Sequence, residues 1–234
     1  LEGDTGLVAW WRETRESYGP PARARLCGRE QRPGEEVFDI HLETLTLAGK
    51  QKVRLTGEQR WLRRARDDDG WAILCREYGE SPDALPGIVQ PVLFAAAAAA
   101  LGHCPRTTAV LIKEDKTVCR PLTLDRQTCL DYLTMLVGDY LAPGPPEAFP
   151  LKGISNWLLK KAPGKNITPE WIASVADEFA ADFPGYLLME EEKTTGVDEY
   201  ISLTEAAVPE NPGELLKRRI LPLYRFTRKE DDHG

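Results

Sequence analysis

The sequence predicts an α/β (α+β) fold in which a mixed β-sheet is flanked by helices. Between residues 35 and 77, apolar side chains alternate with polar ones, which is the pattern of half-buried strands. An alanine-rich apolar run follows, and the last third places apolar side chains at helical spacing. The chain has 234 residues, of which 42% are hydrophobic, so it is long enough for one large domain or two small ones.

The first predicted element is a short helix at residues 6–16, which carries Trp10 and Trp11 and is followed by Gly-Pro-Pro. We treat residues 1–35 as a helical lead-in and residues 36–234 as the main domain, and the lead-in can also belong to that domain. The paired tryptophans suggest a surface that binds a partner. Packing against the chain's own core explains them equally well.

Antiparallel strands are predicted next, because the period-two pattern holds over residues 38–42 and 53–55. A returning strand is predicted at residues 71–75, after the turn sequence Asp-Asp-Asp-Gly. A helix should then run from about Pro91 to Leu101, and it is apolar on all sides, which indicates that it is buried.

Further along the chain, strands at 107–112 and 117–120 are predicted to form a hairpin. An amphipathic helix over 124–141 should bury one stripe of side chains. This stripe comprises Leu130, Leu133, Leu136, Val137, Tyr140 and Leu141.

The last third is predicted to be mostly helical. Thr168 followed by Pro169 is a strong helix start, residues 190–198 form a polar loop, and a final helix covers 213–225. The buried face of the first of these helices is predicted to comprise Trp171, Ile172, Val175, Ala176, Phe179 and Phe183.

Net charge and cysteine content limit the classes of protein to which this chain can belong. The 30 Lys and Arg and 37 Asp and Glu residues give a formal net charge of −7, which disfavours a free-standing nucleic-acid-binding protein. Five widely spaced cysteines suggest reduced thiols and a cytoplasmic location. The longest apolar run is about half of what a membrane-spanning helix needs, so no membrane contact is predicted.

No cofactor or metal site is predicted, because the common nucleotide, zinc-protease and serine-hydrolase motifs do not occur. The strongest trace of catalytic chemistry is Glu114-Asp115-Lys116, which follows an apolar strand. Magnesium-dependent nucleases combine such an acid and lysine with a second carboxylate, here Asp39 or Glu43. The alternative interpretation is a solvated hairpin tip.

Three basic clusters are candidates for phosphate contact, each near an aromatic residue in the sequence. The favoured one is Arg63, Arg64 and Arg66, close to Trp61. The other two are Lys160 with Lys161 and Lys217 with Arg218 and Arg219. Runs of charge also occur on solvated faces that bind nothing.

The sequence RRILPLYRF at residues 218–226 closely resembles the chain end of the RecC family, the gamma subunit of exodeoxyribonuclease V. Weaker similarity extends back to about residue 38. It involves Val53 to Gly57, Pro121, Leu122, Asp131 to Leu133, Leu136, Asp139 to Leu141, Pro146, Pro150, Leu151, Gly196 and Asp198 to Tyr200.

The resemblance implies the C-terminal domain of a longer RecC-like chain, with a restriction-endonuclease-like fold, a degenerate form of the PD-(D/E)xK nuclease fold. It implies a noncatalytic role in subunit assembly and the DNA path of the RecBCD helicase-nuclease, in double-strand-break repair and recombination. The expected partners are RecB-like and RecD-like subunits, with DNA bound in the context of the complex. An active nuclease using Glu114 and Lys116 stays as the alternative, and the resemblance transfers no functional residue individually.

Overall fold

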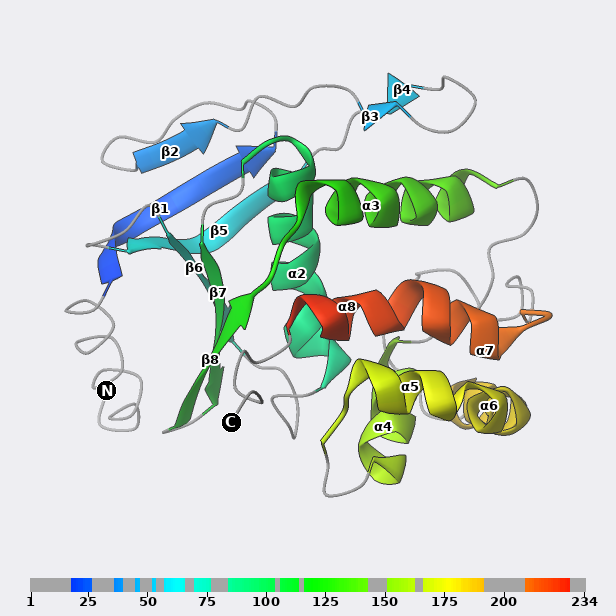
Figure 1. Cartoon of the computed structure of the whole chain (residues 1–234). Helices are drawn as coiled ribbons and strands as arrows, with labels where there is room; N and C mark the ends of the chain where they lie inside the picture. The colour runs from blue at the N-terminus through cyan, green and yellow to red at the C-terminus, as the bar shows by residue number, and fades with distance from the viewer. Residues whose placement is uncertain are drawn as a thin grey trace.

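The computed structural model describes residues 18–26, 36–39, 45–46, 52–53, 57–65, 70–76, 84–103, 106–113, 116–142, 151–162, 166–191 and 209–227. The predicted helix at residues 6–16 and most of the predicted loop at 190–198 lie outside these ranges. The described residues form a mixed α/β structure, as the sequence predicts, with the sheet on one side and the helices packed against it (Figure 1).

The main sheet has six strands in the order β2-β1-β5-β6-β7-β8, and β3 and β4 form a separate pair. The strands are β1 (Tyr18–Leu26), β2 (Glu36–Asp39), β3 (Leu45–Thr46), β4 (Lys52–Val53), β5 (Gly57–Ala65), β6 (Trp71–Arg76), β7 (Thr107–Lys113) and β8 (Lys116–Leu122). The returning strand and the later hairpin are therefore confirmed.

Strand direction departs from the prediction at one edge of the sheet, where β2 pairs with β1 in parallel rather than antiparallel. Alternation of apolar and polar residues reports which face is buried and says nothing of direction, so the sequence cannot make this distinction. β1 itself was not predicted, because Pro20 and Pro21 look like breakers. They lie where its pairing with β5 shifts register, a position at which a sheet tolerates proline.

Helix α2 (Leu85–Ala100) connects β6 to the parallel strand β7. It begins six residues earlier than predicted, and Pro91 lies inside it. The prediction placed the start at Pro91 because proline lacks the N–H that would bond to residue 87. Most of the side chains around Pro91 are buried, which compensates for that loss. Gly102, two residues after the last helical residue, has a φ of +88°.

The remaining helices form a layer over α2. They are α3 (Arg126–Leu141), α4 (Leu151–Lys161), α5 (Pro169–Ser174), α6 (Ala176–Glu191), α7 (Pro212–Leu215) and α8 (Leu221–Phe226), with a π-helical segment η3 (Leu216–Ile220) joining the last two. Figure 1 shows α8 lying between α3 on one side and α4 with α5 on the other. The start of α5 is confirmed, since Thr168 Oγ1 accepts a hydrogen bond from Trp171 N.

The buried face of α3 differs from the predicted stripe. Its buried residues are Cys129, Tyr132 and Leu133, whereas Tyr140 and Leu141 are 87% and 44% exposed. Of the predicted stripe only Leu133 is buried, and the buried face is turned toward Cys129 and Tyr132, which the stripe did not include.

We expect Gly213→Ala to lower the free energy of unfolding by about 1–3 kcal/mol, because the added Cβ would lie 2.5 Å from Ala176 O. The matched control is Gly138→Ala, where a Cβ meets nothing within 4 Å. That change should stabilise α3 by about 0.5–1 kcal/mol through helix propensity. Urea unfolding of the two variants should therefore give shifts of opposite sign, and a shared direction would contradict this packing.

Candidate functional site at the C-terminal helix

Two of the residues proposed for a magnesium site lie on opposite edges of the main sheet. Asp39 ends the edge strand β2, Lys116 begins the opposite edge strand β8, and Glu43 and Glu114 lie outside the described residues. Four strands separate β2 from β8, so at roughly 4.8 Å between neighbouring strands the two backbones lie about 24 Å apart. Asp39 and Lys116 therefore do not share one metal site in this sheet.

Of the favoured basic cluster, Arg63, Arg64 and Arg66, only the first two are among the residues that the structure describes. Arg63 and Arg64 lie in β5, in register with Ala72 and Trp71 of β6. Arg66 lies outside the described residues, as do the predicted partner-binding residues Trp10 and Trp11.

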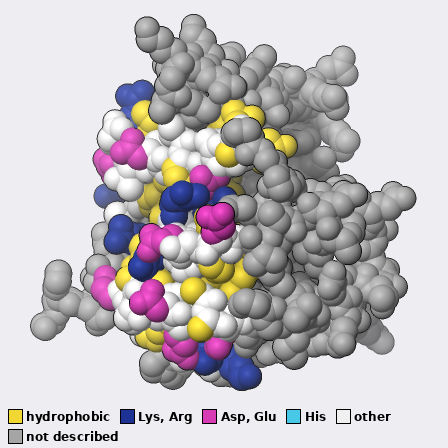
Figure 2. All heavy atoms as spheres, turned by 90° about the vertical axis from the view of Figure 1, so that its right-hand side faces the viewer, with side chains coloured by type: hydrophobic (Ala, Val, Ile, Leu, Met, Phe, Trp, Pro, Cys, Tyr) yellow, Lys and Arg dark blue, Asp and Glu magenta, His cyan; other side chains and the backbone are white. Residues whose placement is uncertain are grey.

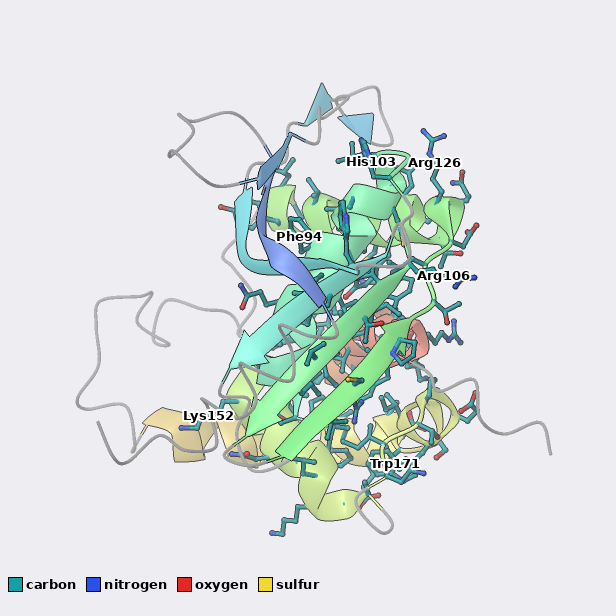
Figure 3. All side chains as sticks on the ribbon, turned by 90° about the vertical axis from the view of Figure 1, so that its left-hand side faces the viewer. Phe94, His103, Arg106, Arg126, Lys152 and Trp171 are labelled. Atoms are coloured by element: carbon teal, nitrogen blue, oxygen red, sulfur yellow. The ribbon has the colours of Figure 1, made fainter. Side chains whose placement is uncertain are left out.

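Metal ligands do not gather in the part of the chain that the structure describes, where no three His, Cys, Asp or Glu residues form a possible site. His103 is exposed just beyond α2, and Cys104 lies outside the described ranges. Figure 3 shows His103 beside Arg126 at the end of α2, where Arg126 Nε donates to Ala100 O at 3.4 Å. Arg126 thus caps the carboxyl end of a buried helix.

The C-terminal basic cluster is the best-defined polar site in the structure. Arg218 Nη2 donates to both carboxylate oxygens of Asp139 at 2.8 and 2.9 Å, and Arg219 Nε donates to the same carboxylate at 2.8 Å. The side chains of Asp139 and Arg219 are 17% and 19% exposed. One carboxylate near the end of α3 therefore binds two guanidinium groups of the segment η3.

A second contact joins α3 to the same segment, because Tyr132 Oη donates to Arg219 O at 2.6 Å. Burial raises the pKa of Tyr132 above its ordinary value, so the hydroxyl stays protonated and remains a donor. The ring of Tyr132 also packs against Phe226, with ring centroids 5.7 Å apart.

Pro222 explains why this part of the helix is π-helical. It has no N–H to donate to Arg218 O, and Leu221 N instead bonds to Leu216 O, five residues earlier. Tyr132 supplies a side-chain donor at the neighbouring carbonyl, that of Arg219. The local irregularity and the contacts from α3 thus occur at the same turn.

In the cluster of Lys160 and Lys161, Lys161 makes its polar contacts with other residues of the same chain. Lys161 Nζ lies 2.5 Å from Glu178 Oε1, 3.1 Å from Asp182 Oδ2 and 5.7 Å from the centre of the Trp157 ring. Hydrogen bonds from Trp157 Nε1 and then Lys161 hold the pKa of Asp182 below its usual value. Hydrogen bonds to Glu178 and Asp182 raise the pKa of Lys161.

Surface charge gives no single-sign patch on the face that Figure 2 shows. Basic and acidic side chains interleave across the described part of this face. The labelled side chains in Figure 3 also lie apart, with Arg126 near one end of the molecule and Lys152 near the other. Lys217 is likewise paired, with Glu214 at 2.9 Å. Lys161, Lys217, Arg218 and Arg219 thus each pair with a carboxylate of the same chain.

Sequence analysis missed Asp139 and Tyr132 as members of this cluster. A weak signal was present, because Asp139 lies seven residues after Tyr132, which places the two side chains on the same face of one helix. Their partners lie about 80 residues later in the chain, however, and no local pattern identifies such a pairing.

Comparison with known proteins finds no family, curated protein or solved structure that matches this chain. Among the described residues, none of the helices combines the length and apolar character that crossing a bilayer requires.

Asp139→Asn should lower the free energy of unfolding by about 1–3 kcal/mol, because it leaves two partly buried guanidinium groups without a charged acceptor. Glu214→Gln is the control, since it removes the exposed ion pair to Lys217 and should change stability little. Denaturant unfolding measures both variants. An equal loss in the two variants would show that the Asp139 cluster has no special structural role.

Proposed function

We propose that the chain is a noncatalytic assembly and DNA-path domain of a RecC-like subunit, within a RecBCD-type helicase-nuclease. The observation that carries the proposal is the C-terminal sequence at residues 218–226, whose order of basic, apolar, proline and aromatic residues resembles the end of RecC chains. A mixed sheet with a helical crossover between two parallel strands is compatible with the restriction-endonuclease-like fold that this resemblance implies.

The burial and hydrogen bonds of residues 218–226 support a structural role for this segment. Its apolar residues Ile220, Leu221, Leu223, Tyr224 and Phe226 are buried. Its first two arginines bind Asp139. Phe226 O accepts a hydrogen bond from Thr123 N, which ties the end of α8 to the start of the α3 region. Because these residues pack and hydrogen-bond within the fold, they are consistent with a domain that has a role in assembly and no catalytic role.

The proposal predicts that the folded chain binds the RecD-like or the RecB-like subunit of the same organism. Isothermal titration calorimetry should show saturable binding, with a dissociation constant of about 1 μM or tighter for a stable subunit contact. An unrelated acidic protein of similar size, titrated with the same subunits, controls for nonspecific association. Circular dichroism should first establish that the chain is folded, and failure of the folded chain to bind either subunit would refute the proposal.

A further inference from the structure

We draw no further inference here: the strongest candidate, the exposed apolar end of helix α3 at Tyr140 and Leu141, carries none, because nothing in the structure shows what covers it.

Discussion

The fold depends on the burial of α2, a helix that has no polar face. Its alanines at positions 95 to 100 are all at most 4% exposed, so the helix must be covered by the sheet on one side and by other helices on the rest. The small side chains allow close approach, and β6, β7, α3, α4 and α8 all contact it. Although α3 and the C-terminal helical segment are far apart in the sequence, both lie over α2, and Asp139 and Tyr132 of α3 bind Arg219 of η3, which leads directly into α8.

In the C-terminal segment, which packs against α3, the basic residues 217–219 form ion pairs within the chain. A run such as Lys217, Arg218 and Arg219 in an isolated sequence suggests phosphate binding, but here each side chain binds a carboxylate. Arg218 differs from Arg219 in being 50% rather than 19% exposed.

The sequence predicted those elements whose signals are local. The cap at Thr168, the apolar helix ended by Gly102 and the hairpin of β7 and β8 were all expected. Errors arose where tertiary packing overrides a local rule, as with Pro91 inside the buried α2, and where a pattern lacks the needed information, as with the direction of β2. The carboxylate–guanidinium cluster was missed because its members are about 80 residues apart. For a related reason the sequence did not indicate that Asp39 and Lys116 lie on opposite edges of the sheet, because the residues of a strand do not specify its position in the strand order.

The most direct test of a noncatalytic domain is a nuclease assay on linear double-stranded and single-stranded DNA with Mg²⁺ or Mn²⁺. It compares the purified chain with a Glu114→Ala, Lys116→Ala double variant. We expect no cleavage by either protein, since Asp39 and Lys116 lie on opposite edges of the sheet. Metal-dependent cleavage by the wild-type chain that the double variant abolishes would contradict a noncatalytic role and identify Glu114 and Lys116 as an active site.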